Sequence, residues 1–392
     1  MMLPIIVTRR TPVPRPVAPK HILLYAASEA DADVLYATGF FCPDPFVFIR
    51  TATGQRIYVM SDLEIDRARA QSNAHRVLSM SNYTEIARKR LRKAPAAADV
   101  IAEVLRELKI RSVRVPSGFS AGVADRLRTH GIAVHPADGS LFPERLHKRP
   151  DELAAIVRAM RATEAGMQAA IDLLRRSRVR DGWVVLGGKR LTAEAVRSAA
   201  NLEIFAHGCV PAHTIVAPGK HGCDPHDVGS GPIRSGEPII IDIFPRSEAT
   251  GYFADITRTV VKGRANPKVQ AMYNAVLAAQ RGALRSIRHG ARAKDIHGAI
   301  LDLFEKRGFA TGKIDGRMQG FFHGTGHGLG LEIHEPPRIA MTDVKLEAGM
   351  VVTVEPGLYY QGVGGMRIED TVLVTRTGVR NLTRFPKFLE IP

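Results

Sequence analysis

Five residues in the C-terminal half of the chain have types and positions suited to binding metal ions: Asp242, Asp255, His327, Glu355 and Glu369. They lie within or beside apolar, strand-like runs that read EPIIIDIF, GYFADITRTV, FFHGTGHGLGLEIHE, MVVTVEPGLYY and MRIEDTVLV. Strand interiors normally bury apolar side chains, and buried carboxylates are rare unless they are paired or bound to a metal. Four carboxylates and a glycine-flanked histidine in such runs therefore predict a carboxylate-rich metal site.

Repulsion between these carboxylates indicates how many cations the site would need. Two like charges about 4 Å apart repel by about 4 kcal/mol at an effective dielectric constant of about 20. Four ionised carboxylates must therefore take up protons or hold cations, and two divalent cations would balance their charge. Oxygen ligands with one imidazole suit Mn²⁺, Co²⁺, Fe²⁺ or Zn²⁺, and the oxygen majority favours Mn²⁺. Two adjacent cations can share a hydroxide and lower its pKa.

Two predicted hairpins would position the four carboxylates. Asp242 ends an isoleucine run and Asp255 begins the next strand, with the turn-rich stretch PRSEATG between them. A hairpin places such residues on neighbouring strands and on the same face. Glu355 and Glu369 repeat this arrangement around a glycine cluster, and His327 comes from a third segment. One such residue alone is more often a strand end or a cap, but the five in this order favour a metal site.

Helix pairs alternate with strands through the rest of the C-terminal half. Pro150, followed by acidic residues, marks a helix start and a domain boundary within HKRPDE, residues 147–152. The order of helix pair, strands, helix pair and strands predicts a duplicated half-unit, although no repeated residue string accompanies it. The expected helices cover 151–177, 192–206, 266–289 and 292–307, and the expected strands lie in 210–262 and 319–377.

The N-terminal part predicts a separate α/β domain. Residues 1–20 are rich in proline and arginine and predict an extended arm. From residue 21 onward short strands alternate with helices, which is typical of a largely parallel sheet. The strands expected are HILLYAA, PFVFIR, RIYVMS and SVRVP, and the helices cover 30–36, 85–93 and 96–108. The predicted organisation is an arm (1–20), an N-terminal domain (21–148) and a C-terminal domain (149–392).

Composition limits the classes of partner. The net charge of +16 and the pI near 10.1 raise the possibility of nucleic-acid binding. The excess is spread along the chain, and its densest run, Arg88–Lys93, falls on a predicted helix with Glu85 one turn before Lys89. That pattern is typical of a solvated helix face, and no nucleic-acid motif accompanies it. We therefore expect no nucleic-acid partner.

Apolar runs, the N-terminal sequence and the cysteines bear on membrane association and on the cellular compartment. No window offers about 18 uninterrupted apolar residues, so we expect no membrane span. The N-terminal sequence MMLPIIVTRRTPVPRPVAPK lacks the pattern of a secretory signal. Three cysteines, Cys42, Cys209 and Cys223, form neither a disulfide framework nor a zinc spacing. A reducing cytoplasm is the setting that we expect.

The motifs around the five residues resemble those of the M24 or "pita-bread" metallopeptidases, the family of methionine aminopeptidase, aminopeptidase P and prolidase. The resemblance covers residues 150–390 and matches the order Asp, Asp, His, Glu, Glu in full. The N-terminal domain is similar to the one that aminopeptidase P, prolidase and creatinase add to this catalytic domain. The fold implied is an α/β N-terminal domain followed by an α+β pita-bread domain with pseudo-two-fold halves, and a homodimer is implied as well.

By this resemblance each of the five residues has an expected role. Asp242 would chelate one metal, Asp255 and Glu369 would bridge both, and His327 and Glu355 would complete the other. Glu355 would also handle protons from a water or hydroxide that bridges the two metals. Creatinase resembles the fold but lacks this metal set. The chain departs from the family after Asp242, where a longer loop beginning IFP replaces the common small residue.

Three further histidines match family positions near the substrate. The resemblance implies that His226 contacts the amide at the scissile bond, although a surface loop histidine is the alternative. His334 would face the scissile carbonyl and donate to the negative charge that develops on its oxygen. His323 would line the pocket for proline.

Two arginines match positions that distinguish members of the family. Arg367 is shared by proline-specific members, so the resemblance implies a place among the substrate-binding residues, and it would support the acidic cluster through charge-assisted bonds. Arg338 matches an arginine that in some prolidases binds the free carboxylate of a C-terminal proline, a task suited to a bidentate guanidinium. An ordinary loop arginine on a basic surface is an equally good interpretation of Arg338.

Four other residues have two interpretations each. The threonines could hydrogen-bond the metal ligands or serve as ordinary strand residues. The tyrosines could line the pocket or simply pack. These four residues are Thr257, Thr259, Tyr252 and Tyr359.

The sequence therefore predicts a metallopeptidase with two divalent metals that cleaves Xaa-Pro bonds near peptide N-termini. The attacking group would be the hydroxide that bridges the two metals, and the substrate would be a peptide or dipeptide with proline in second position. One alternative is a hydrolase or lyase of a small metabolite on the same scaffold, because fold does not settle substrate. Another is a catalytically inactive binding protein, which the full set of metal ligands disfavours.

Overall fold

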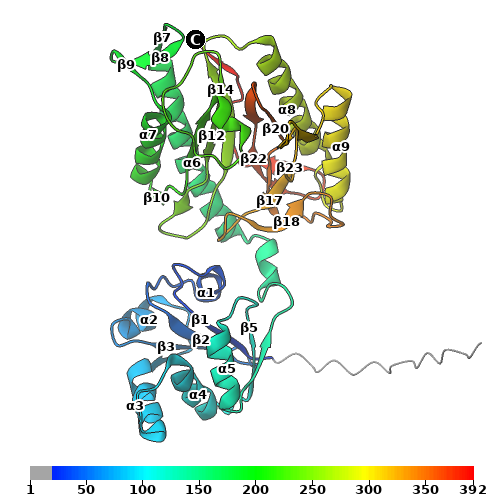
Figure 1. The fold of residues 1–392 in the computed structure, drawn as a ribbon. Helices are drawn as coiled ribbons and strands as arrows, with labels where there is room; N and C mark the ends of the chain where they lie inside the picture. The colour runs from blue at the N-terminus through cyan, green and yellow to red at the C-terminus, as the bar shows by residue number, and fades with distance from the viewer. Residues whose placement is uncertain (1–19) are drawn as a thin grey trace, which may run out of the picture. The chain divides into compact units, whose positions relative to one another are not determined.

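The computed structural model describes residues 20–392, whose contacts divide the chain into two compact units, Met1–Phe142 and Pro143–Pro392 (Figure 1). The arm predicted for residues 1–20 falls, apart from Lys20, outside the described residues. The boundary expected after residue 148 lies a few residues downstream of this division, within the short segment that precedes the first long helix of the second unit.

The first unit contains a six-stranded mixed sheet with the order β4-β3-β2-β1-β5-β6. The pairs β3–β4, β1–β5 and β5–β6 are parallel, but β1, β2 and β3 run antiparallel. The expectation of a largely parallel sheet was therefore wrong for the central strands. Only residues 51–55 separate β2 from β3, and a parallel crossover needs about a dozen residues or more.

Helices cover this sheet so that both of its faces are buried. Along β1 the side chain of Leu23 packs in one apolar cluster, whereas Ile22 and Leu24 pack in another, as strand alternation requires. The strands are β1 Ile22–Ala26, β2 Phe46–Arg50, β3 Arg56–Met60, β4 Arg76–Ser79, β5 Ser112–Val115 and β6 Ala133–Pro136. The helices are α1 Ala32–Thr38, α2 Ile65–Gln71, α3 Met80–Leu91, α4 Ala97–Glu107 and α5 Ala121–Thr129.

The second unit consists of two halves, each with a helix pair packed on its own sheet. Figure 1 shows α6 and α7 on one side of the strands and α8 and α9 on the other. The helices are α6 Pro150–Arg176, α7 Ala193–Ala206, α8 Pro267–Ser286 and α9 Ala293–Lys306, which confirms all four predicted helices within a few residues. The pita-bread fold class is therefore confirmed.

The two sheets of this unit bring together strands that lie far apart in the sequence. The first has the order β11-β12-β14-β24 and the second has the order β18-β17-β19-β22-β23. The first contains β11 Ile215–Pro218, β12 Pro238–Ile243, β14 Ile256–Lys262 and β24 Glu390–Ile391. The second contains β17 Gly326–Gly328, β18 Glu335–Ile339, β19 Val351–Val354, β22 Asp370–Val374 and β23 Val379–Asn381.

Smaller elements complete the second unit. The sheet β7-β8-β9 and the pairs β10-β13, β15-β16 and β20-β21 join these segments. The strands are β7 Arg178–Arg180, β8 Trp183–Leu186, β9 Lys189–Arg190, β10 Cys209–Val210, β13 Arg246–Ser247, β15 Gly312–Ile314, β16 Arg317–Gln319, β20 Gly357–Tyr360 and β21 Gly364–Arg367. Two 3-10 helices cover η1 Pro143–Leu146 and η2 Gly219–Cys223.

Alternation along the strands separates an apolar face from a polar one. On β12, Ile239 and Ile241 pack in the cluster that contains α6 and α7, whereas Ile240 contacts Tyr359 from the other half. On β19, Val352 and Val354 pack in the cluster that contains α8 and α9. Each sheet therefore turns apolar residues toward its helices, and the intervening residues face the region between the halves.

Helices α6 and α7 pack unusually closely at one point. A Cβ atom placed on Gly166 would lie 2.5 Å from Cγ1 of Ile204, a side chain with no exposed surface. Glycine is required here by the close approach of the two helices and not by backbone conformation. Among residues 20–392, no helix combines the length and the apolar character that crossing a membrane requires.

Candidate metal centre

The pair β12–β14 sets the first two carboxylates on one face. Asp242 is paired with Thr257 across the two strands, and Asp255 lies two residues before Thr257. Residues two apart on a strand point to the same side, so Asp255 and Thr257 share the face that Asp242 occupies. This is the face that points away from α6 and α7, because Ile241 and Ile243 point toward those helices.

The pair β19–β22 sets the second two carboxylates opposite one another. Val354 is paired with Asp370, so the next residues outward, Glu355 and Glu369, stand across from each other. His327 enters from β17, which is the neighbour of β19 in the same sheet. The two hairpin-like pairs expected from the sequence therefore exist and present their acids toward a common region.

Distances join all five side chains into one cluster. Ligand atoms of Asp255, His327 and Glu369 lie within 4.8 Å of one another, and all three residues are buried. Nε2 of His327 lies 3.6 Å from Oδ2 of Asp255 and 3.5 Å from Oε1 of Glu355. Oγ1 of Thr257 lies 2.8 Å both from Oδ1 of Asp242 and from Oε2 of Glu369.

Burial and mutual repulsion make the charged forms of these acids costly. Burial, with the charges of the neighbouring carboxylates added, raises the pKa values of Asp255 and Glu369 well above their ordinary range. Burial also raises the pKa of Glu355 to about 7, although the positive charge of Arg367 opposes the shift. For His327, burial together with the charge of His334 lowers the pKa to about 3, so its imidazole is neutral.

Two features of the cluster fit bound cations. Oδ1 of Asp255 and Oε1 of Glu369 are buried and accept no hydrogen bond from any described residue. The single hydroxyl proton of Thr257 can satisfy only one of the two carboxylates that it touches. A buried carboxylate oxygen left unpaired costs several kcal/mol of free energy, roughly, and a cation removes that cost. The residues present therefore suit divalent cations.

The histidine of the cluster is oriented as a metal ligand. Nδ1 of His327 lies 3.1 Å from the carbonyl oxygen of Gly328 and donates to it, which leaves the Nε2 lone pair free. The backbone N–H of His327 donates to Oγ1 of Thr353 at 3.1 Å. Fixing the ring through its second nitrogen is the usual way in which proteins prepare an imidazole for a metal.

The guanidinium of Arg367 hydrogen-bonds to one carboxylate of the acidic cluster and to two hydroxyls beside it. Its Nη2 donates to Oδ2 of Asp242 at 2.7 Å, its Nη1 to Oη of Tyr359 at 2.8 Å and its Nε to Oγ1 of Thr257 at 3.2 Å. All three nitrogens are thus engaged, and only 4% of the residue is exposed. This geometry favours the supporting role over direct contact with a substrate.

The hydrogen-bond chain continues from Arg367 to His323. Oη of Tyr359 accepts from Arg367 and lies 2.9 Å from Nε2 of His323, to which it donates. Nδ1 of His323 donates to the carbonyl oxygen of Gly324 at 2.8 Å. Burial lowers the pKa of His323 to about 3, with the charge of Arg367 acting in the same direction. His323 is therefore a neutral, fixed side chain, flanked by the rings of Phe321 and Phe322.

His334, His226 and Arg338 lie on the solvent side of the cluster, and all three are exposed. The ring of His334 packs edge-on against His327, with centroids 4.4 Å apart. Burial, followed by the charges of Arg338 and His226, lowers the pKa of His334, so all three face one region. Arg338 is also paired with His327 across β17 and β18.

The structure resolves the alternative interpretations of four residues. Thr257 hydrogen-bonds two ligands, whereas Thr259 exchanges hydrogen bonds with the backbone of Arg367. Tyr359 links Arg367 to His323, as described above. Tyr252 packs away from these groups and donates to Oε1 of the buried Glu152 at 2.6 Å.

Arg258 is a residue that the sequence analysis missed. It is 2% exposed, and its Nη1 donates to the carbonyl oxygens of Thr257 and Glu369 at 2.9 and 2.5 Å. Its Nη2 donates to Oδ1 of Asp370 at 2.9 Å. The guanidinium therefore joins β14 to the start of β22 beneath the cluster. The sequence signal that could have identified Arg258 is its position in the middle of an apolar strand, where a cation is rare unless it is paired.

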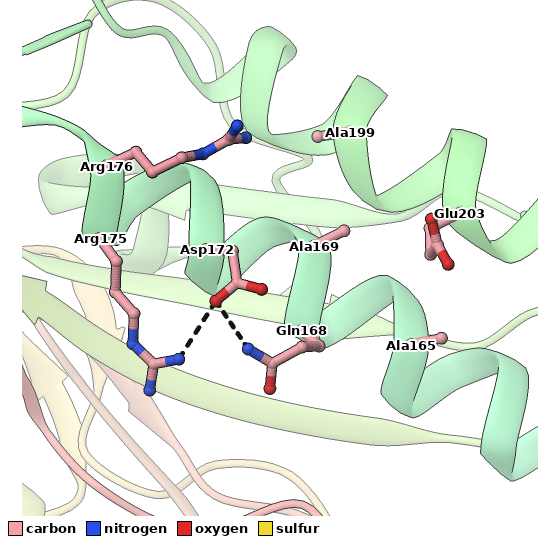
Figure 2. Close-up of a pocket in the computed structure, with 8 residues that line it drawn as sticks. All are labelled: Ala165, Gln168, Ala169, Asp172, Arg175, Arg176, Ala199 and Glu203. Atoms are coloured by element: carbon pink, nitrogen blue, oxygen red, sulfur yellow. Dashed lines mark hydrogen bonds and ion pairs between the residues drawn. The ribbon is translucent and has the colours of Figure 1, made fainter.

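A surface hollow elsewhere in this unit has a different character. It has a volume of about 640 Å³ and lies between α6 and α7, far from the predicted site residues in sequence. Figure 2 shows alanines, charged residues and Gln168 around it, and its Asp172 already accepts hydrogen bonds from Arg175 and Gln168. None of the predicted site residues lines it, so the hollow carries none of the chemistry described above.

Comparison with known proteins places the chain in a family. The sequence profile of metallopeptidase family M24 matches residues 154–376, more than half of the chain. This protein therefore belongs to metallopeptidase family M24, as the resemblance predicted. Within the family it belongs to the branch of prolidase and aminopeptidase P, and it is an enzyme of that metallopeptidase type.

Individual relatives support this branch. The Xaa-Pro dipeptidase of Pyrococcus furiosus is 34% identical over 288 residues, which cover 73% of this chain and 77% of that protein. Xaa-Pro aminopeptidase 1 of Streptomyces coelicolor is 32% identical over 299 residues, 69% of this chain and 58% of that protein. The solved structure of an Xaa-Pro dipeptidase from Bacillus anthracis superimposes with a TM-score of 0.79 at 26% identity and covers 95% of both chains.

Replacing Asp255 with asparagine should have opposite effects on the metal-free and metal-loaded protein. Without metal, the Asp255→Asn variant should melt about 2–4 °C higher at pH 8, because it removes a buried carboxyl whose raised pKa costs the folded state stability at that pH. With excess Mn²⁺, the variant should lose the stabilisation that the unmodified protein gains. Asp125→Asn is the control, since that side chain is 74% exposed and pairs with Arg128. Undiminished metal content in the Asp255→Asn variant would contradict the site.

Metal uptake should depend on pH through the carboxyls and not through His327. Below its raised pKa each carboxyl holds a proton that a cation must displace, so affinity should rise between about pH 6 and about pH 8, up to about tenfold per pH unit for each proton displaced. His327, with its pKa lowered to about 3, holds no competing proton in this range. Calorimetry in buffers of different ionisation enthalpy measures both the affinity and the protons released. A constant affinity without proton release would show that the acids are not the ligands.

Proposed function

We propose that this protein hydrolyses the peptide bond between an N-terminal residue and a following proline. The observation that carries the proposal is the buried acidic cluster, in which Oδ1 of Asp255 and Oε1 of Glu369 lack a hydrogen-bond partner among the described residues. Relatives in the same branch bear the names Xaa-Pro dipeptidase and Xaa-Pro aminopeptidase. The cluster supports metal-dependent hydrolysis, and the relatives support the choice of bond.

The cluster would hold two divalent cations. Asp242 would bind one cation, His327 and Glu355 the other, and Asp255 and Glu369 would be shared between them. The majority of oxygen ligands favours Mn²⁺, although Co²⁺, Zn²⁺ and Fe²⁺ suit the same donors. When bound, the cations would supply a water molecule activated for attack and positive charge for the carbonyl oxygen before proline.

Glu355 and His334 are the residues placed to handle protons and developing charge. The side chain of Glu355 is 18% exposed, against 11% for Asp242 and 6% for Asp255, so it is the one of these three that solvent reaches best. A carboxylate beside a metal-bound water can accept a proton from that water and return it to the leaving amine. His334, which is exposed and packs edge-on against His327, would donate to the oxygen of the scissile carbonyl.

The remaining residues would hold the substrate. His323, with the rings of Phe322 and Tyr359 around it, offers a neutral, partly apolar surface suited to a proline ring. His226 would contact the amide at the scissile bond from the exposed loop before β12. The guanidinium of Arg338 donates no hydrogen bond to the described residues, so it is available to bind a carboxylate.

The proposal also covers the cellular compartment, the oligomeric state and the expected substrates. The three cysteines are free and buried, which suits a reducing cytoplasm. A homodimer would follow the resemblance to the family. The expected substrates are peptides or dipeptides with proline in second position, and nucleic acid is not among the expected partners.

A substrate panel tests the proposed activity. Protein loaded with Mn²⁺ should release the N-terminal residue from Xaa-Pro dipeptides and Xaa-Pro-Yaa peptides but not from Met-Ala peptides. The physical reason is that a pocket built around His323 and aromatic rings fits the ring of proline at the second position. Release is measured by mass spectrometry for each divalent metal. Equal rates on Met-Ala and Xaa-Pro peptides would exclude specificity for proline.

Arg338 should decide the preferred length of the substrate. Only in a dipeptide does the proline carry a free carboxylate, so Arg338→Ala should lower kcat/KM for Xaa-Pro dipeptides by about tenfold or more, as loss of a charge-assisted pair predicts. Tripeptides, whose proline carboxylate is part of an amide, should lose much less. Arg317→Ala, at an exposed position on β16, is the control. A similar loss on both lengths would remove the carboxylate-binding role.

A further inference from the structure

We propose that Glu335, Arg145 and Lys148 form a buried ionic anchor that positions His334, and this proposal rests on the catalytic role given to His334 above. Glu335 follows His334 directly in the chain. Its carboxylate is only 4% exposed. No role in the reaction has been given to these three residues so far, and none of them contacts the acidic cluster in any described hydrogen bond.

The carboxylate of Glu335 is fully satisfied from two directions. Oε1 accepts from Nη2 of Arg145 at 2.5 Å and from the backbone N–H of Glu332 at 3.1 Å. Oε2 accepts from Nζ of Lys148 at 3.1 Å. Burial alone would raise the pKa of Glu335, but Lys148 and Arg145 more than offset this and hold it below its ordinary value. Glu335 is therefore an ionised, buried carboxylate.

The two cations are themselves well fixed. The side chain of Lys148 is 3% exposed and that of Arg145 is 11% exposed. Nζ of Lys148 also donates to the carbonyl oxygen of Arg145, and the backbone N–H of Lys148 donates to the carbonyl oxygen of Gly349 at 2.8 Å. Gly349 lies just before β19, the strand that leads to Glu355. A buried lysine is rare, and here its partners are specific.

The anchor also organises the loop that leads to His334. A Cβ atom on Gly330 would lie 2.8 Å from a carboxylate oxygen of Glu335, so the loop backbone passes directly over that carboxylate. The carbonyl oxygen of Gly330 accepts from the N–H of Phe253 at 2.8 Å, two residues before Asp255. Residues 329–335 are thus tied through the Glu335 carboxylate to Arg145 of η1 and to Lys148, whose backbone N–H binds Gly349 before β19. The carbonyl oxygen of Gly330 ties the same loop to the approach to β14.

His334 depends on this loop because little else holds its side chain. The residue is exposed, and its imidazole takes part in no side-chain hydrogen bond among the described residues. Its ring contact with His327 limits its tilt, but the position of its Cα follows from the backbone next to Glu335. Misplacing a catalytic group by about 1 Å can cost about a hundredfold in rate. The anchor therefore acts on catalysis by placing His334, not by touching the substrate.

A double-mutant cycle tests the anchor. Lys148→Met should lower kcat for an Xaa-Pro peptide by about tenfold or more, with little change in KM or in metal content. In a His334→Ala background the same substitution should change kcat by less than about twofold, because the residue that it positions is already gone. Lys148→Arg, which keeps the charge, should restore most of the rate. Lys294→Met is the control, since Lys294 forms a pair with Asp343 that is largely exposed.

A second measurement does not depend on activity. Hydrogen exchange at residues 329–335 should be faster in Lys148→Met than in the unmodified protein, whereas exchange in β12 and β22 should be unchanged. Arg145→Gln, which removes the other cation, should give the same pattern and replaces Lys148→Met if that variant does not fold. An equal loss of kcat with and without His334, a parallel loss of metal, or unchanged exchange at 329–335 would overturn the anchor.

The two proposals can fail separately. If the unmodified protein loaded with metal cleaves no Xaa-Pro peptide, the proposed function is wrong, and the exchange measurement still decides whether the anchor orders the loop. If the unmodified protein cleaves such peptides but the cycle shows no coupling to His334, the function stands and the positioning role is wrong.

Discussion

The rest of the structure depends on holding four carboxylates together in a largely buried region. Asp242, Asp255, Glu355 and Glu369 face one another across two strand pairs, and among residues 20–392 only Arg367 joins a cationic side chain to one of these carboxylates by a hydrogen bond. A single guanidinium cannot balance four negative charges, so the acids must hold protons or divalent cations. Burial and this uncompensated negative charge raise the pKa values of Asp255, Glu355 and Glu369.

The fold accommodates these acids because the apolar residues that stabilise it and the polar residues of the site lie on opposite faces of the two sheets. Each sheet turns alternate apolar residues toward its own helix pair, which gives two apolar clusters on either side of the site. The opposite faces are then free to carry acids, threonines and Arg367. Burying apolar side chains stabilises a domain enough to offset the cost of a repelling cluster, and binding of cations to the folded state adds further stability.

Neighbouring groups fix the tautomer of one clustered side chain and the hydrogen bonds of others. The carbonyl oxygen of Gly328 fixes the tautomer of His327, and Thr257 lies between Asp242 and Glu369. Below them Arg258 binds the backbone of both Thr257 and Glu369. On the solvent side His334 is held by the loop around Glu335. The clustered side chains are thus fixed by a buried framework, whereas His226, His334 and Arg338, which would meet a substrate under the proposed function, are exposed.

The sequence by itself predicted the five candidate metal ligands and indicated the four long helices and the family, because strand alternation and the order of five residues are local patterns that can be read along the chain. It missed the antiparallel centre of the first sheet, Arg258 and the anchor at Glu335. The last two depend on contacts between distant residues: Arg258 and Glu369 are 111 positions apart, and Lys148 and Glu335 are 187 apart. Only the tertiary structure decides such pairs, because a buried charge is stable wherever the folded chain supplies its partner, and local sequence does not specify where that is.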